Sequence, residues 1–210
     1  MVSETEKPVR LQESHIGQAA EALARAFLND PDFAELVPEH RKRAGILPLL
    51  FRVMLCRGIR RGEVYATSSA MEGVSIWFPS GFYDMPFRAL AGCGGLGLLF
   101  KVSWRLLWKM KQEEVFATRL HRRLAPFPHW YLAVLGVRPE FRGKGCASRV
   151  VKPVLDRLDA LKLPAYVETS VNEYIDLYRH FGFKVLREAA LPGSHGKMWV
   201  MLRDAAGEGR

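Results

Sequence analysis

Cysteine is scarce in this chain: its 210 residues include only three, Cys56, Cys93 and Cys146. An odd number of widely spaced cysteines indicates neither a disulfide framework nor a zinc site, so we expect reduced thiols. No histidines, cysteines and carboxylates stand at metal-ligand spacing either, and no metal is expected. This composition argues against a disulfide-stapled secreted scaffold and against a metalloprotein.

Long hydrophobic runs are also missing. The first eight residues contain no apolar segment of the kind found in signal peptides. The apolar stretch around 87–100 is interrupted or flanked by Arg88, Lys101 and Arg105, so it is too short and too charged to cross a bilayer. We therefore expect a cytoplasmic protein without stable membrane insertion, although residues 101–111 are compatible with a helix lying on a membrane surface.

Negative charge is in the minority. The 22 acidic residues face 31 lysines and arginines, which gives a formal net charge of +9. Such a balance attracts polyanions: nucleic acid, an anionic membrane or a phosphate-bearing cofactor. The basic clusters at 41–43, 57–61 and 119–123 lie on predicted helices, contain few aromatics and match no nucleic-acid motif. We interpret them as solvated helix faces and expect no nucleic-acid partner.

What is present is typical of one globular domain spanning 1–210, with 49% hydrophobic and 25% charged residues. Apolar spacing predicts a helix capped by Ser14 that runs to about Leu28, and a second helix over about 39–58. Strands are predicted at 63–67 and 73–78. Two antiparallel strands, 183–189 and 197–202, close the domain.

The most informative segment is Trp130–Ala147. It begins as an apolar run rich in strand formers and breaks at Arg138-Pro139. Then it passes through Arg-Gly-Lys-Gly into a helical pattern over 148–161. A loop that leads into a helix N-terminus exposes unpaired backbone N–H groups and the positive end of the helix dipole. The segment therefore predicts a phosphate-binding site.

Two common phosphate loops fit this segment poorly. The P-loop pattern fails, because the residue five positions after Gly136 is a phenylalanine. A dinucleotide fingerprint would use Gly143 and Gly145, but Ser148 stands where the third glycine belongs. Glu168, at the end of the next predicted strand, could imitate the ribose-binding acid, so this alternative is weakened but stays open.

A third pattern fits at every fixed position. Residues 142–147, Arg-Gly-Lys-Gly-Cys-Ala, match Gln/Arg-x-x-Gly-x-Gly/Ala, the pyrophosphate loop of the GNAT N-acetyltransferases. Further on, 165–170 reads Ala-Tyr-Val-Glu-Thr-Ser, and 177–183 carries a Leu-Tyr-x-x-x-Gly-Phe element. From about 129 to 203 the chain resembles this family, and in order and spacing the branch that contains puromycin N-acetyltransferase.

The resemblance implies a fold and a co-substrate. The fold would be α/β, of the α+β type, with a mixed, mostly antiparallel sheet flanked by helices. A parallel strand pair in its middle would open to admit acetyl-CoA. Residues 80–127 would form a helical insertion, which either lines the acceptor site or simply packs over the domain.

The resemblance also implies which residues hold the cofactor. Loop amides would take the pyrophosphate, and an amide of the preceding strand would polarise the thioester carbonyl. Gly136 in mid-strand is typical of a bulge or a close backbone approach, or it merely ends the strand. Asn172 stands one position downstream of the asparagine usual in the family. The predicted cofactor-binding residues are Leu135, Gly136, Val137, Arg142, Gly143, Lys144, Gly145, Cys146, Ala147, Ser148 and Asn172.

Two residues are candidates for the chemistry. The resemblance implies that Tyr178 protonates the departing thiolate, whereas a tyrosine in this position is otherwise typical of a packed helix. Glu168 is the candidate base for the amine. It could act directly, through water or by binding a cationic acceptor, or it could be a structural acid at a strand end. His129 could reach the acceptor side, although such histidines are more often structural.

These observations predict an enzyme that transfers acetyl from acetyl-CoA directly to a primary amine of a small molecule, without an acyl-enzyme. A protein or peptide amine is the alternative acceptor. Outside this class, a non-catalytic acyl-CoA-binding regulator and a basic nucleic-acid or membrane adaptor are the alternatives. The sequence identifies neither the acceptor nor the oligomeric state; a homodimer is compatible with it.

Overall fold

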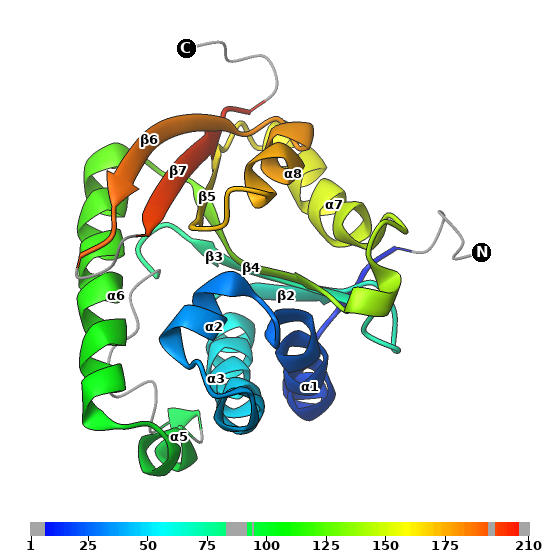
Figure 1. The fold of residues 1–210 in the computed structure, drawn as a ribbon. Coiled ribbons are helices and arrows are strands. Elements are labelled where there is room, and N and C mark those ends of the chain that lie inside the picture. Colours follow the sequence, from blue (N-terminus) through cyan, green and yellow to red (C-terminus); the bar gives the residue numbers. More distant parts are fainter. Residues whose placement is uncertain (1–6, 83–91, 94, 193–195, 206–210) are drawn as a thin grey trace.

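The computed structural model describes residues 7–82, 92–93, 95–192 and 196–205, and within them a single mixed sheet organises the chain (Figure 1). The sheet has seven strands in the order β1-β2-β3-β4-β5-β7-β6. Neighbouring strands are antiparallel except β4 and β5, which are parallel. This confirms the predicted fold class. The strands are β1 (Val9–Arg10), β2 (Glu63–Ala66), β3 (Gly73–Pro79), β4 (Trp130–Val137), β5 (Ala165–Thr169), β6 (Lys184–Ala190) and β7 (Lys197–Arg203).

Helices cover both faces of the sheet. Helices α1 (Ile16–Phe27), α2 (Pro31–Leu36) and α3 (His40–Arg61) lie on one side of β2–β4 (Figure 1). Helices α7 (Cys146–Ala160) and α8 (Tyr174–His180) lie on the other. The two larger apolar clusters lie on opposite faces of the sheet: α1 and α3 bury one against β2–β4, and α7 and α8 bury the other against β4 and β5.

The first predicted helix has a different start, and a second helix follows it. A 3-10 turn, Glu13–His15, precedes α1, and the N-cap is His15 rather than Ser14. The predicted end near Leu28 is confirmed, since α1 ends at Phe27, but a second helix, α2, begins directly afterwards at Pro31. The Asp30 side chain accepts the Asp32 backbone N–H at 3.1 Å, and Pro31 occupies the first helical position. The sequence analysis missed this short helix.

The parallel pair opens as the resemblance implied. Residues Trp130–Leu132 pair with Ala165–Val167, and no further β4–β5 pair forms within the described residues. A register shift against β3 leaves Ala133 as an extra residue in β4, so the bulge lies there and not at Gly136. Gly136 instead allows close packing: an added Cβ would lie 2.6 Å from Leu23 Cδ2.

The cysteine prediction was wrong for one pair. Cys56 in α3 and Cys93 are joined by a disulfide, with Cα atoms 5.7 Å apart, while Cys146 is free and buried. These two residues are 37 positions apart, so their proximity is a result of the tertiary fold. The reduced-thiol argument for a cytoplasmic location therefore does not apply to this pair.

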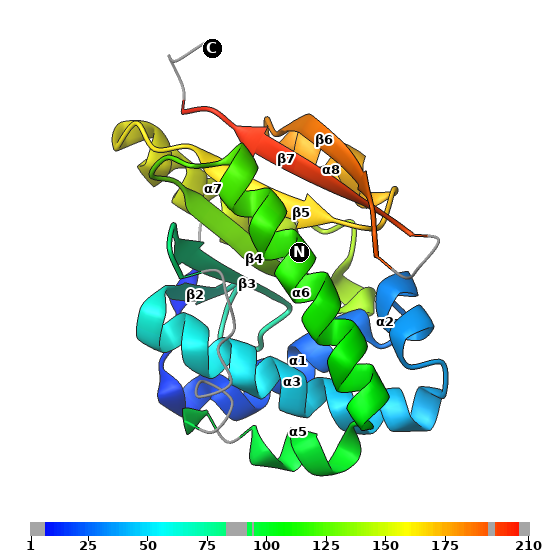
Figure 2. The same ribbon diagram turned by 90° about the vertical axis from the view of Figure 1, so that its left-hand side faces the viewer.

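The predicted insertion is helical where it is described. It contains α5 (Leu96–Lys101) and α6 (Trp104–Leu124), while 83–91 and 94 lie outside the described residues. Helix α6 crosses the strands obliquely (Figure 2) and packs on β5 and β7 through Phe116, Ala117, Leu120 and Leu124. Of the helices in the described ranges, none is both long and apolar enough to span a membrane.

Candidate active site

Two adjoining cavities lie where β4 and β5 diverge. The larger, about 340 Å³, is the loop cavity; the smaller, about 190 Å³, is the carboxylate cavity. They share Phe27, Leu135 and Tyr174, so the two cavities are neighbours. The loop cavity is further lined by Gly136, Val137, Arg142, Gly143, Gly145, Cys146, Ala147 and Ser148. The carboxylate cavity is further lined by Asp30, Asp32, Phe33, Phe51, Glu168 and Tyr178.

The loop has the backbone that a pyrophosphate site needs. Gly143 and Gly145 have φ angles of +71° and +74°, and an added Cβ would meet nothing within 4 Å at either. Glycine is therefore required there by conformation rather than by space. Gly145 is also the N-cap of α7 and has no side chain to accept the first-turn amides. These amides, and the positive end of the α7 dipole, are left for an anion.

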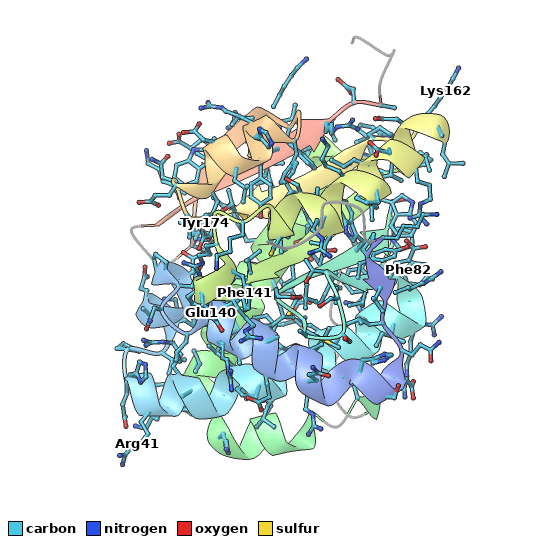
Figure 3. The ribbon with its side chains drawn as sticks, turned by 90° about the vertical axis from the view of Figure 1, so that its right-hand side faces the viewer. Arg41, Phe82, Glu140, Phe141, Lys162 and Tyr174 are labelled. Carbon is cyan, nitrogen blue, oxygen red and sulfur yellow. A yellow bond between two sulfur atoms is a disulfide. The ribbon has the colours of Figure 1, made fainter. Side chains whose placement is uncertain are left out.

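The basic residues of the loop are placed differently from each other. Arg142 Nη2 donates to the Ala26 carbonyl at 2.8 Å, so this guanidinium ties α1 to the loop. Lys144 is exposed, with Nζ 5.4 Å from the centroid of the Phe141 ring. Figure 3 shows Phe141 and Tyr174 on the same side of the molecule, with Lys162, just beyond α7, at the far edge.

Glu168 lines the carboxylate cavity from β5. Its side chain is only 11% exposed. The Tyr166 hydroxyl donates to Glu168 Oε1 at 2.6 Å, and the Tyr131 hydroxyl donates to the same carboxylate. Burial raises the pKa of Glu168 to about 7, although both hydrogen bonds oppose the rise. A carboxylate with this pKa is suited to proton transfer near neutral pH.

Tyr178 lies in the same cavity, on α8. It is 7% exposed, and burial raises its pKa well above the usual range, with Tyr174 and Asp30 adding to the rise. The phenol therefore stays protonated at every ordinary pH, as a proton donor must. Glu168 and Tyr178, which the sequence analysis singled out separately, line one cavity.

Three titratable residues that line the cavities were not predicted as site residues. The Tyr174 hydroxyl donates to Asp30 Oδ2 at 3.2 Å at the junction of the two cavities, and burial, reinforced by Asp30, raises the pKa of Tyr174 to about 12. Burial also raises the pKa of Asp30 and Asp32, with nearby Asp30 and Glu35 contributing at Asp32. The sequence offers one signal, Asp30-Pro31 just after the predicted end of the first helix, and such a pair indicates a chain break rather than a cavity residue.

Several predicted residues lie elsewhere. Asn172 is exposed and lines neither cavity. His129 is 2% exposed and packs against His121 of α6, so it does not face the carboxylate cavity. Among the described residues, none from α6 lines either cavity.

The expectation that the protein holds no metal can be compared with the structure only over the described residues. No group of three or more potential metal ligands occurs within the described ranges.

Comparison with known proteins gives the same picture as the loop. Residues 90–183 match the family model described as the Acetyltransferase (GNAT) family. This stretch is similar to the GNAT acetyltransferases. An uncharacterised N-acetyltransferase of Schizosaccharomyces pombe is 23% identical to the chain, over 96% of this chain and 84% of the relative. The family model and this relative support an N-acetyltransferase.

Solved structures share the GNAT fold. A histone acetyltransferase HPA2 and related acetyltransferase from Corynebacterium glutamicum has a TM-score of 0.64 at 20% identity, covering 97% of this chain and 98% of that one. Arylalkylamine N-acetyltransferase 2 from Aedes aegypti has a TM-score of 0.61 at 14% identity, covering 95% and 98%. At these identities the likeness shows the fold alone. Membership of the puromycin N-acetyltransferase branch stays a prediction.

Proposed function

We propose that this GNAT protein transfers acetyl from acetyl-CoA to the primary amine of a small cationic molecule. The observation that supports this most is the pair of adjoining cavities, one ending at an uncapped helix N-terminus and the other containing Glu168 and Tyr178. The loop fits a pyrophosphate, because Gly143 and Gly145 leave the backbone open to it. When bound, acetyl-CoA supplies the activated acetyl group as a thioester.

The carboxylate cavity favours an ammonium group. Asp30, Asp32 and Glu168 line it although the chain as a whole carries a net charge of +9. A bound cation would favour the ionised form of each carboxyl group. Phe27, Phe33 and Phe51 pack together beside them, with ring centroids 5.2 to 5.9 Å apart. An amine with an apolar or aromatic body suits this combination, and the similar mosquito protein is named for arylalkylamines.

Glu168 and Tyr178 would divide the proton transfers. Glu168 takes a proton from the ammonium group, which frees the nitrogen lone pair for the acetyl carbon. As the new C–N bond forms and the C–S bond breaks, Tyr178 gives its proton to the sulfur. The nitrogen loses its second proton as the amide forms, and that proton restores the Tyr178 phenol. A backbone amide among Leu135, Gly136 and Val137, all of which line the loop cavity, would stabilise the charge on the carbonyl oxygen.

The test is thiol release from acetyl-CoA with an aromatic monoamine, an aliphatic diamine and a lysine peptide. We expect turnover with the monoamine, and a Tyr178→Phe variant that loses about a hundredfold in kcat while CoA still binds. Tyr65→Phe is the matched control, because its hydroxyl donates to Glu63 at 3.0 Å away from both cavities. CoA binding without thiol release from any amine would favour a non-catalytic regulator, and release with the peptide alone would favour a protein acceptor.

A further inference from the structure

A pair of buried histidines lies behind Glu168. His121 comes from the last turns of α6, and His129 directly precedes β4; each is 2% exposed. Their Nε2 atoms are 2.7 Å apart. The His121 ring stacks on Tyr166, with centroids 3.8 Å apart, and meets the Tyr131 ring edge-on at 5.1 Å. This pair therefore touches both tyrosines that donate to Glu168.

The hydrogen bonds determine which ring nitrogens carry protons. His129 Nδ1 lies 2.7 Å from the Phe127 carbonyl oxygen, which can only accept, so Nδ1 is the protonated nitrogen. Burial lowers the pKa of His129, so the ring is neutral and its Nε2 is an acceptor. His121 Nε2 must then donate to it. Burial, together with His129, lowers the pKa of His121 to about 3, so this ring is neutral too.

His121 therefore has an unprotonated Nδ1, and that atom faces the carboxyl group. Its distance to Glu168 Oε1 is 3.9 Å. A lone pair directed at a carboxylate repels its charge, whereas it accepts a hydrogen bond from the protonated acid. The separation exceeds hydrogen-bond length, so no hydrogen bond joins these two atoms in the structure, and an ionised Glu168 has no proton to donate.

We propose that His121 is a positioning residue for acetyl transfer, whose Nδ1 accepts a hydrogen bond from Glu168 once that carboxyl group has taken the proton of the amine. This inference rests on the proposed function. The N–H bond of the ammonium group breaks and an O–H bond forms on Glu168. The proton stays on the carboxyl group, held toward His121, until it returns to solvent through the carboxylate cavity.

Other groups around Glu168 favour its ionised form, whereas His121 favours the protonated form. Tyr166 from its own strand and Tyr131 from β4 both donate to it, which favours the ionised form. Tyr178 of α8 is close enough to Tyr131 to raise the pKa of that phenol. On β7 the residue paired with Glu168 is Val200. His121, on α6, thus opposes the effect of the two hydroxyl donors on the ionisation of Glu168.

The first test needs no activity. In the full-length protein labelled with 15N-histidine, we expect His121 at neutral pH to show a pyridine-type Nδ1 and a protonated Nε2. His129 should show the reverse arrangement. A protonated Nδ1 on His121, or an imidazolium ring, would overturn the proposal.

The second test compares two variants that should shift the titration midpoint of the Glu168 carboxyl group in opposite directions. His121→Phe keeps a ring stacked on Tyr166 but removes the acceptor at Nδ1, so the midpoint of the Glu168 13C carboxyl titration should fall by about one pH unit. Tyr166→Phe removes a donor to the carboxylate, so the midpoint should rise. The acid limb of kcat/KM should move with each.

Different results would overturn the role in acetyl transfer and the role of His121. Absence of thiol release with every amine would overturn the role in transfer, whatever the histidine tautomers are. In an active enzyme, a Glu168 midpoint that His121→Phe leaves unchanged or raises would overturn the part of His121 alone.

Discussion

Glycine is needed for one reason at two positions of the loop and for another reason at one position of β4. Gly143 and Gly145 adopt positive φ angles in open space, whereas Gly136 lies where an added Cβ would approach Leu23 Cδ2 to 2.6 Å and Phe27 Cε2 to 2.9 Å. A substitution in the loop therefore changes conformation without creating a clash. A substitution at Gly136 would displace α1 from β4 and alter both cavities.

We predict that Gly145→Ala weakens CoA binding about tenfold, because a left-handed conformation costs alanine about 1–2 kcal/mol and the loop amides would turn away. Isothermal calorimetry with CoA measures this. Gly17→Ala is the matched control. Gly17 lies within α1, and its added Cβ would meet only Nη2 of Arg52 in α3, at an ordinary 3.6 Å. Unchanged affinity in Gly145→Ala would mean that the loop amides do not hold the cofactor.

At the scale of elements, the Cys56–Cys93 disulfide attaches α3 to the segment before α5. The contact matters for the site because α3 contributes Phe51 and Met54 to the carboxylate cavity. Helix α5 also packs on α3, through Leu98 against Ile46. The bond thus reinforces one wall of the cavity from outside.

Reduction should lower the thermal stability clearly. Opening a loop with a sequence separation of 37 removes roughly 4 kcal/mol in the chain-entropy description. For a chain of this size that corresponds to a fall in Tm of about 10 °C. Calorimetry with and without reductant measures it. The Cys56→Ser/Cys93→Ser variant keeps Cys146 and should melt at the reduced protein's temperature in both buffers; an equal Tm for oxidised and reduced wild type would contradict the prediction.

Over the whole molecule, the pH dependence of stability depends on carboxyl groups whose pKa values shift in opposite directions on folding. Burial opposes ionisation of Glu63, but bidentate hydrogen bonds and the charge of Arg157 outweigh it and lower the pKa. That contribution is present above the unfolded pKa and is lost as the pH falls. Glu168 behaves oppositely: its pKa rises from 4.5 to about 7, so the folded state loses stability as the pH rises between these values.

We therefore predict that Glu168→Gln stabilises the protein relative to wild type in a pH-dependent manner. The difference in unfolding free energy should grow from pH 4.5 to about 7 and then level off, at a few kcal/mol at most. Denaturant titrations of both proteins at each pH measure it, and the comparison cancels the effect of net charge. Glu63→Gln is the control, and it should destabilise most above the unfolded pKa of glutamate. A Glu168→Gln difference that is flat with pH would show an ordinary carboxyl group.

Much of this site could be predicted because its signals are local in the chain. Strand β4, the glycine loop and α7 are consecutive, so one segment of sequence carries both the phosphate loop and the helix that follows it. At Gly136 the sequence left a bulge, a close backbone approach or a strand end open; the structure has the close approach there and the bulge at Ala133, because the bulge depends on the register against β3. Residues such as Asp30 and Tyr174 gave no comparable signal, since their partners lie far away in the sequence.

The sequence by itself determined the loop, its helix and the succession of strands and helices along the C-terminal half, because glycine conformation and apolar periodicity act between neighbouring residues. Only the tertiary structure decided that Cys56 meets Cys93, that Asp30 and Glu168 line one cavity, and that His121 lies behind Glu168. These relations bring together residues from distant segments. Their burial and charge, which set the proton affinities of the site, exist only once the chain has folded.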